Sequence, residues 1–490
     1  MVISNGVNNV IRRNASSGAT TRPAPAENLV LAIVSLGIFM TVLDLFIVNI
    51  AFPNIQHDFA GSDLSSLSWI LNGYAIVFAA LLVPAGRIAD RIGQKRVFII
   101  GLALFTIASA LCAVATGTTF LIVARLIQAA GAAAITPTSL ALLLTAMPAA
   151  KRTWALGIWT AVGGMGAAAG PTIGGLLVSL SWRWVFLVNL PIGIIAILVA
   201  SRVLQEHRND ESGPRPDLLG ALFLTIGVAA LSLGIVEGPA WGWQSPKVIG
   251  SFIVAIAMAA GFAYRSTHHP SPIVEPALLK VRSFSVSTLS ALLFNASFSV
   301  MLLGLVQFMT DVWGYSALQT GLAISPGPLM VPFVATRGRF LARRFGATPV
   351  AIFGTILFGS AGLSWYFLTG TDQNYAVDIL PGLIVAGIGF GLTLPILLTT
   401  AVSSLPVQRF ATGSAVVTMA RQIGTVLGIS VLIVILDSAG SDIIGAFHQG
   451  WLVMAGASFA AGATAFFLRS GATQPSEALT MVEAPVVVGD

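Results

Sequence analysis

The sequence predicts an all-α protein whose helices cross a membrane fourteen times. Three observations predict this class: the composition, a series of long apolar runs, and an uneven distribution of basic residues between the two sides. Of the 490 residues, 56% are hydrophobic and 9% are charged, whereas about a quarter of the residues in soluble domains are charged. The single cysteine, Cys112, and five scattered histidines offer neither a disulfide framework nor a cluster of metal ligands.

The apolar runs are long enough to cross a bilayer, which takes about 20 residues per helix. They lie at 29–51, 68–86, 97–116, 119–146, 154–178, 184–204, 217–237, 247–265, 285–309, 318–336, 348–370, 377–400, 412–436 and 446–468. Residues 1–28 lack an apolar core of signal-peptide length. We expect a disordered cytoplasmic tail at 1–28 and a second cytoplasmic tail at 471–490.

The basic residues test this count of helices. With the amino terminus inside the cell, 21 of the 25 Lys and Arg residues fall on the inner side, two fall outside and two fall within helices. Cytoplasmic loops of membrane proteins are enriched in Lys and Arg, so a missed or extra helix would have removed this bias. We therefore expect both termini in the cytoplasm of a multi-pass protein of the cell membrane. The net charge of +6 then reflects topology and not a nucleic-acid partner.

Two loops repeat one pattern. Residues 86–96 read GRIADRIGQKR, and residues 338–346 read GRFLARRFG, without an acid and with one residue more between the glycines. The loops are eight helices apart, as two equivalent bundles of six helices with two extra helices between them would place them. The expected division is a first bundle at 29–205, a linker with two extra transmembrane helices at 206–283, and a second bundle at 284–470.

The first of these loops resembles a signature of the major facilitator superfamily, G-x3-D-R-x-G-x-[KR]-[KR]. The matching residues are Gly86, Asp90, Arg91, Gly93, Lys95 and Arg96. In that superfamily the loop is a latch between the halves, and the resemblance implies this role for Gly86, Asp90, Arg91, Gly93 and Arg96. A carboxylate at this place can pair with arginines and with the N-terminus of a facing helix. The alternative is a basic loop that only anchors the cytoplasmic side.

The fifth apolar run resembles the antiporter signature of exporters in the same superfamily, G-x8-G-x3-G-P-x2-G-G. The matching residues are Gly157, Gly166, Gly170, Pro171, Gly174 and Gly175. Glycines three or four residues apart leave a groove where a neighbouring backbone can approach closely, and the proline should bend the helix. The alternative is ordinary tight packing. We expect Gly170→Leu to prevent closure on the outer side.

Further stretches are similar to the branch of fourteen-helix drug:proton antiporters. They are Leu43–Pro53, in which Phe46 stands where Thr is usual, Trp182–Gly193, Trp241–Trp243 and Arg421–Gly424. The resemblance implies a major facilitator fold and multidrug efflux, with resistance to antibiotics as its consequence.

Asp44 and Arg125 are the candidates for proton coupling. Asp44 lies about 22 Å along the first helix from the inner face, and Arg125 about 9 Å along the fourth from the outer face, at 1.5 Å per residue. In a core of about 30 Å these depths nearly coincide. The arginine would favour the ionised carboxylate and an apolar surrounding would oppose it, so alternating access can change the proton occupancy. A static ion pair that joins the two helices is the alternative.

Polar and aromatic residues on other helices are candidates for a substrate cavity, because drug-binding cavities are mostly apolar with a few polar anchors. They are Trp69, Asn72, Tyr74, Gln128, Phe294, Asn295, Phe298, Gln307, Arg421 and Gln422. The shortage of acids at mid-depth favours weakly charged or neutral amphipathic substrates over dications.

The sequence thus favours a proton-coupled antiporter that exports amphipathic drugs, antibiotics or related natural products by alternating access. Its expected partners are these substrates, protons and lipids, and we expect a monomer without cofactors, metal ions or nucleic acid. A proton-linked importer or symporter of a small organic solute is the alternative. A membrane enzyme or sensor would need a cluster of nucleophile, acid and base at one depth, and the sequence indicates none.

Overall fold

The structure, a computed structural model, describes residues 27–59, 61–148, 151–206, 216–406 and 409–468. The tail predicted at 1–28 lies outside this part of the chain except for residues 27 and 28, which begin the first helix. The tail predicted at 471–490 and residues 207–215 of the linker also lie outside the described residues. All regular secondary structure in the described residues is helical.

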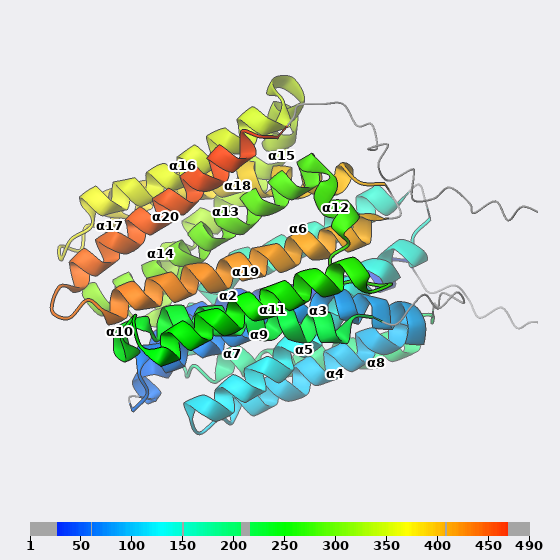
Figure 1. Cartoon of the computed structure of the whole chain (residues 1–490), viewed down its shortest axis with the longest axis horizontal. Coiled ribbons are helices and arrows are strands. Elements are labelled where there is room, and N and C mark those ends of the chain that lie inside the picture. The colour runs from blue at the N-terminus through cyan, green and yellow to red at the C-terminus, as the bar shows by residue number, and fades with distance from the viewer. Residues whose placement is uncertain (1–26, 60, 149–150, 207–215, 407–408, 469–490) are drawn as a thin grey trace, which may run out of the picture.

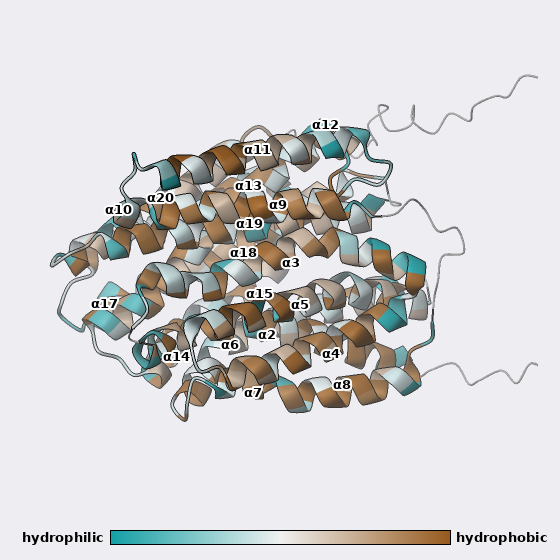
Figure 2. Cartoon of the chain, turned by 60° about the horizontal axis from the view of Figure 1, so that its bottom comes forward, coloured by the Kyte–Doolittle hydropathy of each residue, from teal (hydrophilic) through white to brown (hydrophobic). Residues whose placement is uncertain are grey.

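Fourteen helical segments of the described chain are long and apolar enough to cross a membrane, which confirms the predicted number. They are α2 (Glu27–Asp58), α3 (Leu64–Ile92), α4 (Gln94–Ala113), α5 (Thr118–Ala146), α6 (Arg152–Val178), α7 with α8 (Trp184–Leu187, Asn189–Val203), α9 (Leu218–Val236), α11 (Pro246–His268), α13 with the π-helix η2 (Arg282–Gln307, Phe308–Val312), α14 with α15 (Ala317–Ile324, Pro326–Phe345), α16 (Ala347–Leu368), α17 with α18 (Tyr375–Asp378, Leu380–Ser403), α19 (Phe410–Asp437) and α20 (Ile443–Ala465). Figure 2 shows hydrophobic residues along the helices and hydrophilic ones gathered at their ends. This distribution is the one that a bilayer requires.

Two short helices lie in connections, α10 (Gly238–Trp241) and α12 (Pro276–Lys280). The tenth span, predicted as one helix over 318–336, is instead divided between α14 and α15. Pro326 and Pro328 stand in the first turn of α15, and a proline has no amide hydrogen with which to continue the hydrogen bonds of the preceding helix. The Ser325 hydroxyl donates to the carbonyl of Gly321 at 2.6 Å and covers the junction.

The helices from α2 to α8 pack mainly on one another, and so do those from α13 to α20. We call these groups the first and second bundles. The inserted helices α9 and α11 pack as a pair, and α9 contacts α3 and α19, one helix from each bundle (Figure 1). We call the end of the molecule that carries the α3–α4 turn, with Arg87, Arg91, Lys95 and Arg96, the basic end, and the other the opposite end.

The repeated loops adopt the same backbone shape. Gly93 joins α3 to α4 and Gly346 joins α15 to α16, with φ of 115° and 92°. Side chains other than glycine rarely take such angles. Each glycine also donates its backbone N–H to the carbonyl four residues earlier, Ala89 and Ala342. The two glycines therefore make the same sharp reversal at the ends of equivalent helix pairs.

Candidate functional site

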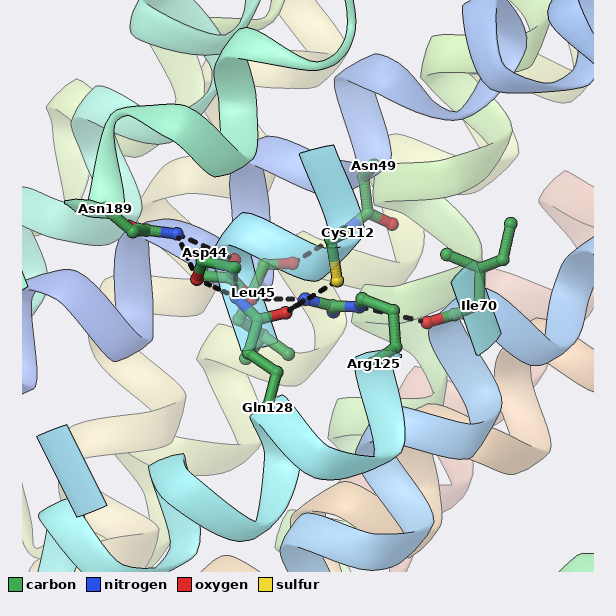
Figure 3. A network of polar contacts seen from close by, with 9 residues as sticks. Asp44, Leu45, Asn49, Ile70, Cys112, Arg125, Gln128 and Asn189 are labelled. Carbon is green, nitrogen blue, oxygen red and sulfur yellow. Dashed lines mark hydrogen bonds and ion pairs between the residues drawn. The ribbon is translucent and has the colours of Figure 1, made fainter. Parts of the chain in front are cut away.

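The centre of the first bundle holds a buried ion pair. Asp44 of α2 and Arg125 of α5 lie 2.5 Å apart between Oδ2 and NH1, and their side chains are 0% and 1% exposed. The guanidinium also donates from Nε to the carbonyl of Ile70 at 3.3 Å and lies 4.0 Å above the ring of Tyr74. The structure thus brings together the two residues whose depths the sequence predicts to coincide (Figure 3).

Amides complete the coordination of the carboxylate. Asp44 Oδ1 accepts from Gln128 Nε2 at 2.8 Å and from Asn189 Nδ2 at 3.2 Å. Ser109 Oγ accepts from the same two amides at 2.8 and 3.4 Å. Three donors therefore hold a carboxylate that has no contact with solvent, which is the condition under which a buried charge is tolerated.

Close helix packing positions this network. A Cβ built on Gly131 of α5 would lie 2.6 Å from the backbone nitrogen of Phe105 in α4, so only glycine allows the two helices to come this close. The approach sets Ser109 of α4 beside Gln128 of α5. Asn189 enters from the first residue of α8, directly after the short helix α7.

Two cavities lie between the bundles. The polar cavity, of about 60 Å³, is lined by Leu45, Phe46, Asn49, Leu71, Ala75, Arg125, Asn295, Phe298, Ser299, Leu302, Arg421, Gln422, Thr425 and Ile429. The apolar cavity, of about 110 Å³, is lined by Phe46, Gly164, Ala167, Ala168, Phe298, Met301, Gly327, Pro328, Val331, Phe358, Leu383, Ala386, Gly387 and Phe390. Phe46 and Phe298 belong to both linings, and their ring centroids are 5.8 Å apart. These two rings form the wall between the cavities.

Four of the ten predicted cavity residues line the polar cavity: Asn295, Phe298, Arg421 and Gln422. Two others, Tyr74 and Gln128, belong to the Asp44–Arg125 network instead.

The remaining four lie elsewhere. Phe294 packs on Phe358, with ring centroids 4.9 Å apart. Trp69 packs beside a small apolar cluster that includes Ile76 and Val426. Asn72 donates to Ser430 at 3.2 Å, and Gln307 is buried in α13. These four residues are in neither lining. Their positions could not be predicted, because the sequence alone does not say which face of a helix meets the second bundle.

Two arginines of the 86–96 segment, Arg87 and Arg96, form ion pairs with glutamates and not with Asp90. Arg96 lies 3.6 Å from Glu206, and the backbone N–H of Lys95 donates to the same carboxylate at 3.1 Å. Asp90 hydrogen-bonds Gln94, and no ion pair joins it to an arginine within the described residues. Its expected pairing with arginines is therefore not what the structure has.

A second cluster at the basic end links the bundles. Glu275, which precedes α12, pairs with Arg87 of α3 at 3.3 Å and also with Arg409, directly before α19. Gly86, Arg91 and Gly93 lie in the same segment of α3 and the α3–α4 turn. The loop thus takes part in a contact that includes both bundles. Its residue in that contact is Arg87 and not Asp90.

The glycines of α6 face two different neighbours. Gly166, Gly170 and Gly174 face α2 of the same bundle, and a Cβ built on Gly170 would lie 2.6 Å from Cβ of Phe46. Gly175 alone of these faces the second bundle, where a built Cβ would lie 2.6 Å from the carbonyl oxygen of Ala317. Gly170 therefore receives its neighbouring helix from within the first bundle, and Gly175 makes the close contact with the second. The effect of Gly170→Leu on closure stays a prediction.

The other two residues of the signature differ from these. Pro171 is buried within α6, and its carbonyl approaches Gly321 of α14. Gly157 is exposed and has no neighbour within 4 Å of a built Cβ. The signature therefore contacts the second bundle only near the opposite end.

Sequence reasoning missed Ser109 and Asn189 as partners of Asp44. Asn189 stands in the Trp182–Gly193 stretch two residues before Pro191, and an amide at the start of an apolar helix is a signal that could have identified it. Ser109 carries no such signal, since serine is frequent in membrane helices and bonds its own backbone there.

The comparisons with known proteins agree with this architecture. The model of the Major Facilitator Superfamily matches residues 34–429. The multidrug resistance protein Stp of Mycobacterium tuberculosis is 35% identical over 409 residues, 82% of this chain and 75% of that protein. The methylenomycin A resistance protein of Streptomyces coelicolor is 32% identical over 434 residues, 86% of this chain and 90% of that protein.

Solved structures match in fold. The crystal structure of an auto-inhibited POT family peptide transporter superposes with a TM-score of 0.64 at 15% identity, covering 91% of this chain and 98% of that one. The identity is too low to carry substrate, so this likeness concerns the fold alone. From the matched family model, the relatives and the fourteen spans, this chain belongs to the Major Facilitator Superfamily, as a membrane transporter related to drug-resistance and export proteins.

Proposed function

We propose that the protein is a proton-coupled antiporter that exports amphipathic drugs, antibiotics or related natural products by alternating access. The observation that carries this proposal is the fully buried Asp44, held by Arg125, Gln128 and Asn189 beside a cavity between the bundles. Arg125 belongs both to the network and to the cavity lining. A change in the cavity can therefore alter the surroundings of the carboxylate, which is what exchange of a proton for a substrate requires.

The basic end faces the cytoplasm in this proposal, since Lys and Arg gather on the cytoplasmic side of membrane proteins. In the same proposal the bundles that move are 29–205 and 284–470, and the linker with its two extra helices is 206–283. On α6, Gly157, Thr160, Ala161 and Gly164 are exposed towards the basic end, whereas Gly170 to Gly175 are mostly buried near the opposite end. This difference supports a conformation that is closed on the opposite side.

The names of the relatives support export over import. Two of them are named for resistance, to multiple drugs and to methylenomycin A, and others are named as export proteins. The buried carboxylate would serve a proton-linked importer equally well, so the direction of coupling decides between the two functions.

Purified protein in liposomes tests the proposal. A panel of dyes and antibiotics is loaded, a pH gradient is imposed, and substrate movement is followed together with the internal pH. Antiport predicts that substrate and protons move in opposite directions, and that dissipating the pH gradient stops accumulation. Movement of both in the same direction would establish the importer or symporter, and substrate movement without protons would contradict both.

A further inference from the structure

The polar cavity contains one positive charge that no residue in the described part of the chain neutralises. None of the carboxylates in the described part of the chain forms an ion pair with Arg421, whose side chain is half-buried at the cavity wall. The other arginine of the lining, Arg125, is neutralised by Asp44 at 2.5 Å. The lining holds no acidic side chain. The cavity therefore carries a net positive charge that originates at Arg421.

The geometry around Arg421 leaves its terminal nitrogens free. Its Nε donates to Asn295 Oδ1 at 3.2 Å, and Asn295 in turn donates to the backbone carbonyl of Arg421 at 3.0 Å and to Thr425. This bracing fixes the direction of the guanidinium. Its two terminal groups, which are the pair that binds a carboxylate side by side, have no hydrogen-bond partner in the described chain.

A second unpartnered donor lies next to it. Gln422 is 4% exposed, lines the same cavity, and its amide Nε2 is buried without a hydrogen-bond partner. A buried donor without a partner has lost its hydrogen bonds to water and gained none in return, which is unfavourable. The other polar side chains of the lining, Asn49, Ser299 and Thr425, donate to backbone carbonyls. The buried polar atom of the lining that lacks a partner in the described chain is thus a donor, and so are the terminal groups of Arg421. An acceptor on a ligand would satisfy both.

The apolar cavity supplies the rest of a binding site. It adjoins the polar cavity across Phe46 and Phe298, and its lining includes Phe358, Phe390 and Met301. The two cavities have volumes of about 60 and 110 Å³. Each is smaller than a site for a drug-sized ligand, which has a volume of at least about 300 Å³. The two rings must therefore move so that the cavities join when a ligand binds.

We propose that this joined cavity binds amphipathic organic monoanions, with a carboxylate or ionised phenol on Arg421 and Gln422 and an apolar body among Phe46, Phe298, Phe358 and Phe390. This inference rests on the proposed function, since it takes the cavity between the bundles as the substrate site. It differs from the sequence expectation of weakly charged or neutral molecules, because it assigns the substrate a single negative charge. The attraction is charge-assisted and lies away from bulk water, where such bonds are strongest.

Matched pairs of ligands test the charge requirement. Binding of 1-naphthaleneacetate, 2-anthraquinonecarboxylate and 4-biphenylacetate is measured by calorimetry on the full chain in nanodiscs, at pH 7.5 and constant ionic strength. The neutral amide of each is the comparison. We expect at least one carboxylate to bind tenfold or more tightly than its own amide. Equal binding of acid and amide in all three pairs, or binding of none of the acids, would overturn the proposal.

Variants test whether Arg421 causes the preference for the acid over its amide. Arg421→Gln is expected to reduce the ratio of acid to amide affinity to near one while the amide still binds, and Arg421→Lys to restore part of it. Lys247→Gln removes the same charge at an exposed position near the opposite end, and its ratio should equal that of the parent. A preference that survives in Arg421→Gln would overturn the assignment. Gln422→Leu is a second test of the site. We expect it to lower the affinity for the acid three- to tenfold and to leave the affinity for the amide unchanged.

The assay uses no proton gradient, so it is separate from the test of antiport. If the acids bind as expected and no proton moves with transport, the proposed function fails and the anion site stands. If protons are exchanged and the acids show no preference, the antiporter stands and the anion site fails.

Discussion

At the scale of single residues, the structure buries the Asp44–Arg125 pair inside the first bundle and leaves Arg421, at the wall of the polar cavity, without an ion pair in the described chain. Asp44 and Arg125 share a site with 0% and 1% exposure, and burying two charges is repaid only by good geometry and full hydrogen bonding. Their pairing could be anticipated from depth along α2 and α5. The approach of Gln128 and Ser109 to this site could not, because side-chain direction depends on how α4 and α5 pack, whereas Asn189 carried a signal at the start of its apolar helix.

We predict that the contribution of the Asp44–Arg125 pair to stability can be measured separately from its contribution to transport. Arg125→Met leaves Asp44 buried without its cation and should destabilise the protein by about 3–5 kcal/mol. The double variant Asp44→Asn with Arg125→Met removes both charges, and its unfolding temperature should return towards that of the parent. Thermal unfolding of the detergent-solubilised proteins measures this.

Transport by the same double variant measures the contribution of the pair to proton coupling. It should remain inactive in proton-coupled export even where stability is recovered. A double variant that is stable and exports at the parent rate would mean that the pair only joins α2 to α5.

At the scale of elements, close approaches of small residues set which helices meet. The sequence predicts that the glycines of α6 receive a neighbouring backbone, but it cannot say which neighbour faces which glycine. Gly170 packs on Phe46 within the first bundle, whereas Gly175 packs on Ala317 across the boundary between bundles. The division of the tenth span could have been predicted from Pro326 and Pro328, since both interrupt hydrogen bonding.

We predict that leucine at these two glycines has different consequences. Gly175→Leu should hold α6 and α14 apart and increase labelling from the opposite side of a cysteine placed at Leu318, in a Cys112→Ser background. Gly170→Leu should overpack the first bundle, at about 1–3 kcal/mol, and lower the unfolding temperature without increasing labelling. Equal labelling in the two variants would contradict this division of roles.

The inserted helices are joined at the basic end by Asp217. This residue accepts from the backbone N–H of Gly220 at 2.8 Å and from Arg265 of α11 at 2.7 Å. Burial alone would raise the pKa of Asp217, but the hydrogen bonds from Arg265 and Gly220 outweigh it and hold that pKa below its usual value. Stability from a carboxyl with a depressed pKa is present above its unfolded pKa and is lost as the pH falls through its folded pKa.

Asp217→Ala should therefore lower the unfolding temperature at pH 7, through loss of a helix cap worth about 0.5–2 kcal/mol and of the pairing with Arg265. The gap from the parent should narrow below about pH 4, where an ordinary aspartate is protonated. Thermal unfolding across pH 3–7 measures it, and a gap that does not change with pH would show that the ionised carboxylate is not what joins α9 to α11.

At the scale of the whole molecule, two bundles meet at different places along their length. Near the opposite end α6 contacts α14, and at the basic end Arg87 and Arg409 converge on Glu275. The fourteen spans and the repeated turns at Gly93 and Gly346 were predictable, because apolar length and glycine spacing are local. The role of Glu275 was not predictable, because its partners are far from it in the sequence. Arg87 lies 188 residues earlier, in the first bundle, and Arg409 lies later, next to α19 of the second bundle.

We predict that Glu275→Gln alters turnover and preserves binding. Its ion pairs are partly exposed, so each should contribute no more than about 1 kcal/mol, and the resulting shift in conformational populations should change the rate of export by roughly two- to tenfold. Transport in liposomes and ligand binding in nanodiscs measure the two quantities. Loss of binding with unchanged turnover would contradict a role in conformational balance.

The account as a whole depends on Asp44 as the proton carrier. Asp44→Asn keeps the size of the side chain and removes its titratable group. In liposomes, addition of a transported substrate should move protons in the opposite direction in the parent, and this proton movement should be absent in Asp44→Asn protein that still inserts and binds substrate. Substrate-driven proton movement at the parent rate in Asp44→Asn would contradict the central claim.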